Sequence, residues 1–276
     1  MEFRTIVDIP VSSWKIKPAH RLLFVGSCFA GNIGRRFAEE RFRVQVNPSG
    51  VMYNPVSVQH EIVRLTADEA QPPSDVVFIT LGTNHVYVLN ETGEIVDNCN
   101  KRPQHLFTER ELTVDECVEA LRLAVDDLLQ RNACVHVVMT VSPIRYRKYG
   151  YHESQLSKAT LLLAVDKLCK LPIYKKVVDY FPAYELVCDE LRDYRFYDTD
   201  MLHPSEQAVE YIWEQFAETY FHADVFTMMR EWKPIKEALQ HRPFNPESED
   251  YQAFMALTKE KLQAFMKKWK GINSPT

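Results

Sequence analysis

A serine, an aspartate and a histidine in this chain stand where they could carry out acyl transfer together. Ser27 follows the apolar run 22–25 and Gly26, and it precedes residues 29–40, which have helical spacing. A serine at such a strand-to-helix junction has the N–H groups of the first helical turn beside it, an arrangement that suits a nucleophile next to an oxyanion hole. Serine is also a good helix N-cap. The position therefore leaves both roles open, and catalysis requires a partner elsewhere.

Asp200 is the only aspartate in the chain with a histidine three positions later, and that histidine is His203. The pair lies on a predicted loop just before a helix whose first turn Pro204 sets. The carboxylate can accept a hydrogen bond from Nδ1–H of the imidazole, which leaves Nε2 to take a proton from a serine. An early serine, a central Gly-x-Asn and a late D-x-x-H thus follow one another in chain order.

Short apolar segments alternate with helical ones over the first 221 residues. Strands are predicted over residues 22–25, 42–46, 75–81, 133–141 and 173–179. Helices are predicted over residues 29–40, 57–65, 113–130, 154–170, 182–191 and 204–221, and a β-hairpin over residues 86–96. This order predicts a three-layer α/β/α domain with a five-stranded parallel sheet. Right-handed crossovers place the carboxyl ends of the strands on one edge, so Ser27, Asn84 and Arg145 should share one rim.

The composition describes a globular protein, with 46% apolar and 26% charged residues. A net charge of −5 gives no reason to expect a nucleic-acid partner. Residues 1–14 show no secretory signal pattern, and no apolar run approaches the roughly 20 residues of a membrane helix. The six cysteines form no C-x-x-C pair and the histidines show no ligand spacing. We therefore expect reduced thiols, a cytoplasmic location, no membrane partner and no structural metal.

The C-terminal part differs in composition, so residues 1–223 are predicted to form the α/β domain and residues 224–276 a helical extension packed on the main domain. Residues 251–276 hold five lysines and one glutamate. A turn-rich segment at residues 242–248 predicts that the extension is a helical hairpin. The apolar stripe of its second helix comprises Phe254, Leu257, Leu262, Phe265 and Trp269. This stripe could pack on the main domain, form an oligomer contact, or lie on a membrane surface. Residues 1–20 read as an irregular arm across the domain.

The order of these motifs resembles that of the SGNH (GDSL-like) hydrolases. Within that group, the string GSCFA at residues 26–30 is the name-giving motif of the GSCFA family. The resemblance continues through the strings NPSGVMYNP, VSPIRY, ELRDYRFY and DMLHPS. It implies the SGNH-hydrolase (flavodoxin-like) form of the α/β/α fold, with Ser27 as nucleophile, His203 as general base and Asp200 as the acid that orients the base.

The resemblance also implies an oxyanion hole formed by the backbone N–H of Ser27, the backbone N–H of Gly50 and the side chain of Asn84. One departure concerns the last of these. The related hydrolases usually show Gly-x-Asn-Asp, whereas His85 follows the asparagine here. Loss of one oxyanion donor raises a barrier by on the order of 3 kcal/mol, so the assignment bears directly on activity.

Further residues at the same rim allow more than one interpretation. Cys28 could replace the serine as nucleophile, because a helix N-terminus lowers the pKa of a thiol, or it could pack against the sheet. His85 could contact substrate, act as a second base or be a buried polar residue. Arg145 could bind an anionic or sugar substrate, or form an ion pair with a carboxylate. Three tyrosines could line a pocket or cover the sheet: Tyr146, Tyr149 and Tyr151.

The function predicted from these observations is serine ester hydrolysis without a cofactor. The expected substrate is a small acyl ester, with an O-acetyl group on a carbohydrate as the main expectation. Acyl transfer to an alcohol would use the same residues. A ligand-binding module that keeps the fold but performs no chemistry is the alternative from another class.

Overall fold

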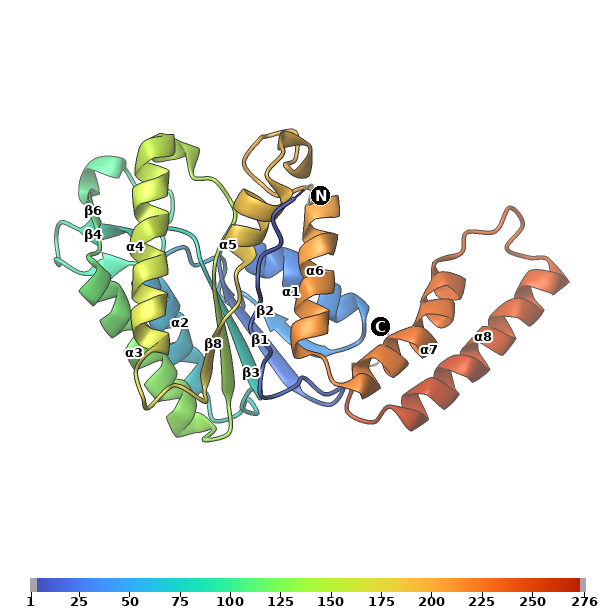
Figure 1. Ribbon diagram of the computed structural model, residues 1–276. Coiled ribbons are helices and arrows are strands. Elements are labelled where there is room, and N and C mark those ends of the chain that lie inside the picture. The colour runs from blue at the N-terminus through green and yellow to red at the C-terminus, as the bar shows by residue number, and fades with distance from the viewer. Residues whose placement is uncertain (1–3, 274–276) are drawn as a thin grey trace.

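The computed structural model describes residues 4–273 and shows a central parallel sheet between two layers of helices (Figure 1). The strands lie in the order β2-β1-β3-β7-β8. They span Arg21–Gly26 (β1), Arg43–Val46 (β2), Val76–Leu81 (β3), His136–Val141 (β7) and Val178–Tyr180 (β8). The predicted three-layer α/β/α architecture with five parallel strands is therefore confirmed.

Alternating side chains of the strands supply two separate hydrophobic clusters, one on each face of the sheet. In β1, Leu22 and Phe24 join the first cluster, whereas Leu23 and Val25 join the second. Helices α1 (Cys28–Glu39) and α6 (Glu206–Tyr220) cover the first face. Helices α2 (Pro55–Ala67), α3 (Val114–Arg131) and α4 (Tyr151–Cys169) cover the second. Burial on both faces explains why the strands read as continuous apolar runs.

The helices begin at side chains that the sequence marks as caps. Thr113 and Glu116 form the predicted capping box at the start of α3. Asn54 caps α2, with Pro55 at the first helical position. Ser205 caps α6, so this helix begins at Glu206, and the prediction that Pro204 sets its first turn is wrong, because Pro204 lies before the cap in a bridge with Tyr197. Local sequence thus sets where these elements begin.

The fifth strand is shorter than predicted, because residues 171–177 fold into turns. The N–H of Tyr174 donates to the carbonyl of Leu171, and those of Val177 and Val178 both donate to the carbonyl of Tyr174. These turns bury the Tyr174 side chain, so the segment that looked like a strand start is a loop, and the prediction of a strand from residue 173 is wrong. The helix predicted over 182–191 consists of a short α5 (Ala183–Glu185) and a π-helix, η3 (Leu186–Leu191).

The predicted hairpin belongs to a small three-stranded antiparallel sheet in the order β5-β4-β6. Strands β4 (His85–Leu89) and β5 (Ile95–Val96) form the hairpin, and β6 (Phe107–Glu111) pairs with the other side of β4. The sequence did not predict β6. Only Phe107 in it is buried, so its residues show no apolar alternation.

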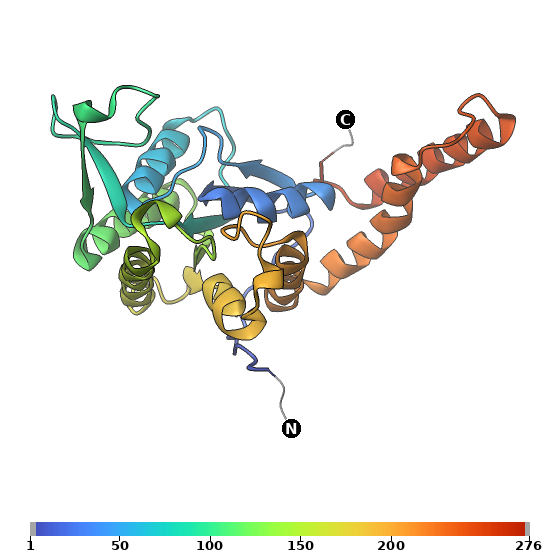
Figure 2. The ribbon, with the colours of Figure 1, turned by 90° about the horizontal axis from the view of Figure 1, so that it is seen from above.

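Helices α7 (Ala223–Gln240) and α8 (Glu249–Lys268) form the predicted helical hairpin, called the C-terminal arm below. The arm projects away from the three-layer body in both views (Figures 1 and 2). Its base is held by the body: Trp232 donates from Nε1 to the carbonyl of Glu39 at 2.8 Å, and the N–H of Asn273 donates to the carbonyl of Arg41 at 2.9 Å.

At the other end of the chain, residues 4–20 run irregularly over the body, as predicted, and a bridge pairs Ile16 with Phe221. Residues 1–3 and 274–276, which are parts of the predicted arm and extension, lie outside the described residues. Across residues 4–273, no helix combines the length and the apolar character needed to cross a membrane.

Candidate active site

Ser27 lies at the carboxyl end of β1, where the chain turns from the sheet into α1. The turn depends on Gly26, whose φ is +140°. A Cβ atom at Gly26 would lie 2.1 Å from the carbonyl oxygen of Thr80 on the neighbouring strand β3, a separation that no side chain tolerates. The glycine before the serine is therefore required by the close approach of β1 and β3.

The Ser27 hydroxyl is buried and hydrogen bonded within the protein. The residue is 1% exposed, and its Oγ lies 3.0 Å from Oγ1 of Thr80. The same oxygen accepts a hydrogen bond from the N–H of Phe29 at 3.3 Å, which makes Ser27 the N-cap of α1. Over residues 4–273 the described hydrogen bonds of this hydroxyl do not include one to His203. The capping role is confirmed, and the nucleophilic role stays a prediction.

Asp200 and His203 form the contact that their spacing predicts. Oδ2 of Asp200 lies 2.6 Å from Nδ1 of His203. Oδ1 of Asp200 accepts hydrogen bonds from the N–H groups of Leu202 and His203 at 2.8 and 2.9 Å. These hydrogen bonds from His203 and Leu202 lower the pKa of Asp200 to about 2, so the carboxylate is ionised at neutral pH. With Nδ1–H donated to it, the neutral imidazole holds its lone pair on Nε2.

His203 also faces a polar cavity of about 470 Å³ between α1 and α6. Asn32 and Arg35 of α1 line the cavity from one side, and Glu206 of α6 lines it from the other. The imidazole is accordingly accessible, with 39% of its side chain exposed. A polar ligand can reach this histidine from the surface.

Arg145 holds the loop that carries the Asp200–His203 pair. Its backbone N–H donates to the carbonyl of Leu202 at 3.0 Å, and Nη1 donates to the carbonyl of Met201 at 3.3 Å. Its guanidinium lies 4.3 Å from the ring centre of Tyr151 and 5.4 Å from that of Tyr197. Within residues 4–273 it forms no ion pair with a carboxylate, the alternative that the sequence left beside substrate binding.

Two of the predicted oxyanion donors are already hydrogen bonded in this structure. The N–H of Ser27 donates to the carbonyl of Thr80 at 2.9 Å. The N–H of Gly50 donates to the carbonyl of Asn47 at 2.9 Å, within a turn in which Gly50 has φ +103°. Each backbone N–H carries one proton, so both groups would have to exchange these partners to bind an oxyanion. Their role in an oxyanion hole stays a prediction.

Asn84, the third predicted donor, is buried with 1% exposure. Its Nδ2 donates to the carbonyl of Leu112 at 2.8 Å, and its N–H donates to Oγ of Ser157 at 3.0 Å. One proton of Nδ2 remains, and Oδ1 is buried without a hydrogen-bond partner in the described part of the chain. The side chain ties β4 to the start of α3, and one donor remains for a ligand.

Cys28, the alternative nucleophile, packs against the first hydrophobic cluster. Its Sγ lies 3.5 Å from the hydroxyl oxygen of Tyr53. The side chain thus takes the packing role that the sequence offered as the alternative to chemistry.

A row of aromatic rings extends from Ser27 toward the small sheet, and the sequence did not predict it as a row. The aromatic row consists of Tyr53, Tyr146, Tyr149 and His85. Tyr53 meets Tyr146 edge to face at 5.9 Å, Tyr146 stacks on Tyr149 at 5.3 Å, and Tyr149 stacks on His85 at 3.8 Å. The row begins beside the serine, since Tyr53 and Ser27 are both neighbours of Gly82. A Cβ atom added to Gly82 would lie 3.2 Å from Tyr53 and 3.4 Å from Cβ of Ser27.

His85, which was predicted to contact substrate, closes the far end of this row. It is 9% exposed, and its Nδ1 lies 3.9 Å from a carboxylate oxygen of Glu109. Burial lowers the pKa of the imidazole, which favours the neutral form. Its Nε2 is buried without a hydrogen-bond partner in the described residues, so the contact with substrate stays a prediction.

Lys158 is a buried cation at the same sheet edge that the sequence did not identify. Its Nζ donates to the carbonyls of Gly82 and Ser142 at 2.7 and 2.8 Å, which lie just after β3 and β7. Burial lowers its pKa to about 7. A signal was available: Lys158 lies next to Ser157 and three positions before Leu161, on the inward face of α4.

Among residues 4–273, no group of three or more histidine, cysteine, aspartate or glutamate side chains could hold a metal ion.

The comparisons with known proteins place the chain in a family. A family model described as the GSCFA family matches residues 21–73 and 64–216. A second model, the GSCFA domain protein C-terminal domain, matches residues 232–274. No curated protein matches the chain in sequence.

Several solved structures are similar in fold to part of this chain at low identity. One is a protein of Parabacteroides merdae named as a GDSL-like lipase, with 14% identity, a TM-score of 0.49, and coverage of 76% of this chain and 98% of that one. Another is a carbohydrate esterase from Talaromyces cellulolyticus, with 9% identity, a TM-score of 0.44, and coverage of 77% and 99%. An acetyl xylan esterase from Butyrivibrio proteoclasticus has 12% identity, a TM-score of 0.40, and coverage of 77% and 64%.

Proposed function

Because the chain belongs to the GSCFA family, we propose that it is a serine ester hydrolase of the SGNH type. The observation that carries the proposal is the hydrogen bond of 2.6 Å between Asp200 and His203. It fixes the tautomer of an accessible histidine, in a chain whose family motif places a serine at the start of α1.

In the proposed reaction, Nε2 of His203 takes the proton of the Ser27 hydroxyl while Oγ attacks the carbonyl carbon of the ester. The tetrahedral intermediate collapses and the alcohol leaves with the proton that His203 returns to its oxygen. Water then attacks the acyl-serine by the same route, which releases the acid and restores the hydroxyl. The Ser27 hydroxyl must exchange Thr80 for His203 as its partner before the first step.

Two features of the site support a small acyl group carried by a carbohydrate. The Ser27 side chain is almost fully buried, which favours an acetyl group over a longer chain at the reacting carbon. The aromatic row beside it brings the phenol rings and hydroxyls of Tyr53 and Tyr146 to the site, groups that suit a ligand with both C–H surface and hydroxyls. Acyl transfer to a sugar hydroxyl would use the same residues, and analysis of products formed with added sugars separates it from hydrolysis.

A binding module without chemistry is the second candidate, and one specific observation favours it. Both predicted backbone donors of the oxyanion hole, the N–H groups of Ser27 and Gly50, are hydrogen bonded to protein carbonyls. A site that never exchanges these partners would bind an ester and leave it intact.

Hydrolysis of p-nitrophenyl acetate and labelling by a fluorophosphonate test the proposal. We expect the purified full chain to do both, Ser27→Ala to do neither, and Cys28→Ala to keep both. Equal rates in Ser27→Ala and the parent would contradict the serine mechanism. Loss of labelling only in Cys28→Ala would identify the Cys28 thiol as the nucleophile. A parent that binds acetylated sugars but neither turns over nor labels would establish the binding module.

A further inference from the structure

The cavity that His203 lines has the size of a ligand site but not the usual lining. Its volume is about 470 Å³, whereas small-molecule sites measure about 300–1,000 Å³ and are lined mainly by apolar side chains. Here only Pro204 and Val209 are apolar. Apart from His203, the other lining side chains are all polar or charged: Asn32, Arg35, Arg36, Glu39, Asp198, Glu206 and Glu210. Such a lining favours a ligand with hydrogen-bonding groups over most of its surface, because a polar group that is covered without a hydrogen bond costs free energy.

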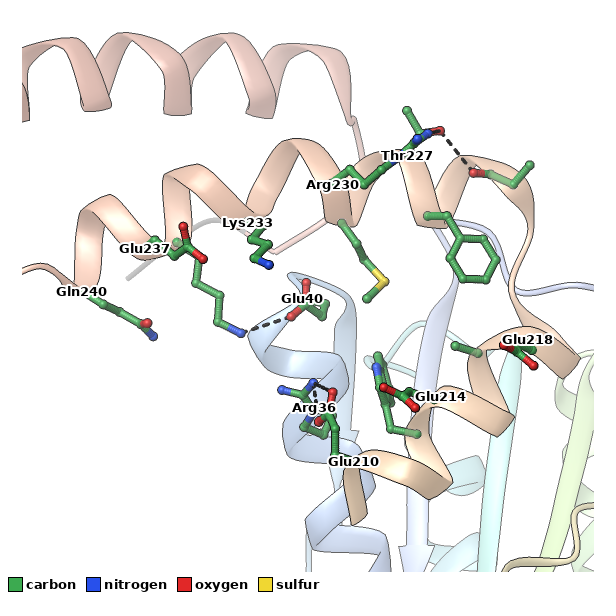
Figure 3. Close-up of a pocket in the computed structure, with 16 residues that line it drawn as sticks. Arg36, Glu40, Glu210, Glu214, Glu218, Thr227, Arg230, Lys233, Glu237 and Gln240 are labelled. Atoms are coloured by element: carbon green, nitrogen blue, oxygen red, sulfur yellow. Dashed lines mark hydrogen bonds and ion pairs between the residues drawn. The ribbon is translucent and has the colours of Figure 1, made fainter. Parts of the chain in front are cut away.

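An ion-pair network lies at the boundary between this cavity and a larger groove of about 940 Å³ along α7. Arg36 binds Glu39 at 3.0 Å and Glu210 at 2.8 Å, and both Arg36 and Glu210 line the groove as well as the cavity (Figure 3). Among the described residues, His203 lines the cavity and does not line the groove. A ligand that meets the imidazole therefore enters the cavity.

Three charged side chains of the cavity remain available to such a ligand. Arg35, Asp198 and Glu206 are exposed, and none of them forms an ion pair within residues 4–273. Nη2 of Arg35 donates to Oδ1 of Asn32 at 3.3 Å, and Oδ1 of Asp198 accepts from the N–H of Thr199 at 2.7 Å. A guanidinium has five N–H donors and a carboxylate about four acceptor positions, so most of this hydrogen-bonding capacity is free.

The cavity also adjoins the group that must meet the leaving alcohol in the proposed reaction. The imidazole returns its proton to the oxygen of the alcohol, which therefore lies within hydrogen-bond reach of His203 as it leaves. The described lining of the cavity does not include Ser27. Asn32, which does line it, is five residues further along α1, about 7.5 Å along the helix axis. The cavity thus suits the alcohol part of the ester and not its reacting carbon.

We propose that this cavity binds the alcohol part of the ester, and that the alcohol is a sugar without negative charge. Arg35 donates to sugar oxygens, while Asp198 and Glu206 accept hydrogen bonds from sugar hydroxyls. A hydroxyl group both donates and accepts, so a sugar can satisfy a lining that mixes guanidinium and carboxylate groups. Four carboxylates line the cavity against two guanidinium groups, an excess that disfavours an anionic alcohol. This inference rests on the proposed function.

Titration calorimetry on the full chain carrying Ser27→Ala tests the proposal, because this variant binds the ester without the proposed turnover. The probe is 3-O-acetylglucose. We expect it to bind, and we expect Arg35→Met and Glu206→Gln, each added to Ser27→Ala, to raise its dissociation constant about tenfold or more, because each removes a hydrogen bond to a charged group. Ethyl acetate, which has the acetyl group but no sugar, should bind at least about tenfold more weakly than the probe.

Arg230→Met and Glu214→Gln are the matched controls. Nη2 of Arg230 also donates to a neighbouring side chain at 3.3 Å, and Glu214 lies on the same helix as Glu206. Both line the groove along α7 and not the cavity, so we expect dissociation constants within about twofold of Ser27→Ala alone (Figure 3). A probe that fails to bind, that binds no better than ethyl acetate, or whose binding Arg35→Met and Glu206→Gln leave unchanged would overturn the proposal.

The excess of carboxylates gives a second test that misfolding cannot mimic. The second probe, 3-O-acetylglucuronate, differs from the first by one carboxylate, and we expect it to bind at least about tenfold more weakly because like charges meet in the cavity. Glu206→Gln should narrow this difference, since it removes a like charge while it weakens binding of the neutral sugar. Equal binding of the two probes, or a difference that Glu206→Gln does not change, would overturn the exclusion of anionic sugars.

Steady-state kinetics of the parent separate this inference from the proposed function. A parent that binds 3-O-acetylglucose without releasing acetate would contradict the esterase and leave the sugar site supported. In a parent that releases acetate, Arg35→Met should raise KM about tenfold with kcat near the parental value, because the sugar is held equally in the ground state and the transition state. An unchanged KM would overturn the sugar site while the esterase stood.

Discussion

The two halves of the proposed site are built in opposite ways. Ser27 is 1% exposed, at the junction of a buried strand and a helix, and a helix cap and a hydrogen bond to Thr80 hold it. The Asp200 and His203 side chains are 44% and 39% exposed, on a loop without regular structure. The serine is fixed by the sheet, whereas the position of the imidazole depends on the few contacts that hold its loop.

This difference indicates where the proposed chemistry is vulnerable. Movement of β1 or α1 would disturb the core. The approach of His203 to Ser27 therefore depends on the loop that carries the histidine and on the residues that tie this loop to the sheet. Arg145 ties the loop to the segment after β7, and Lys158 ties the ends of β3 and β7 together.

Removal of the imidazole from the loop should have the greatest consequence. We expect His203→Ala to lower kcat/KM for p-nitrophenyl acetate about 10⁴-fold, because Ser27 loses its general base. Asp200→Asn should cost about 10³-fold or more, because the amide no longer fixes the tautomer of the histidine. His152→Ala, at an exposed histidine of α4, is the control and should leave the rate unchanged. A rate equal to the parent in His203→Ala would exclude this residue as the base.

Truncation of Arg145 should displace the loop without removing any group that performs chemistry. We expect Arg145→Ala to lower kcat about 10- to 100-fold with little change in KM, because small displacements of a catalytic group are costly. The sequence also allowed Arg145 to bind substrate, and in that case KM would rise while kcat stayed near the parental value. Arg147→Ala, at the exposed arginine two residues on, should behave like the parent in steady-state kinetics.

Lys158 should make the stability of the fold depend on pH. Burial lowers its pKa from 10.5 to about 7, with the Cys188 thiol facing it as a minor opposing influence. Between pH 7 and 10 the unfolded chain therefore binds more protons than the folded one. This group then adds stability as the pH rises, by about 1.4 kcal/mol per pH unit at most. Below pH 7 Lys158 is protonated in both the folded and the unfolded chain, so its contribution to the free energy of unfolding does not change with pH.

We expect Lys158→Met to remove this gain, so the free energy of unfolding of the variant rises less than that of the parent from pH 7 to pH 9. Urea titrations at pH 7, 8 and 9 measure the difference. Lys167→Met, at an exposed lysine of the same helix, should keep the slope of the parent. Parallel slopes for the parent and Lys158→Met would show that the buried amine does not titrate in this range.

The hydrogen bond between Thr80 and Ser27 should have the least influence on the rate. Thr80→Val leaves the buried serine hydroxyl without this partner, and a neutral hydrogen bond is worth about 0.5–1.5 kcal/mol. We expect kcat to rise by less than about tenfold, because the hydroxyl no longer has to give up this hydrogen bond before it meets His203, and we expect Thr80→Ser to return it to the parental value. A loss comparable to that of His203→Ala would mean that Thr80 takes part in the proton transfer.

The local features of the site could be read from the sequence because short-range geometry dictates them. The strand, glycine and serine at residues 21–27 form the predicted junction, and the hydrogen bond between Asp200 and His203 spans three residues. The capping box at Thr113 and the turn that folds the arm have the same origin. The alternation of apolar runs was enough to predict the parallel sheet.

Only the tertiary structure decided which partners satisfy the polar groups of the site. The amide of Asn84 donates to the carbonyl of Leu112, and Lys158 donates to the carbonyls of the residues that follow β3 and β7. Each contact joins segments 16 to 76 positions apart. Strand β6 and the aromatic row likewise depend on pairing across distant segments. Sequence spacing cannot specify such contacts, because they depend on how packed elements meet. The amino-acid sequence by itself thus determined the junction, the sheet and the Asp–His pair, and the tertiary structure determined their surroundings.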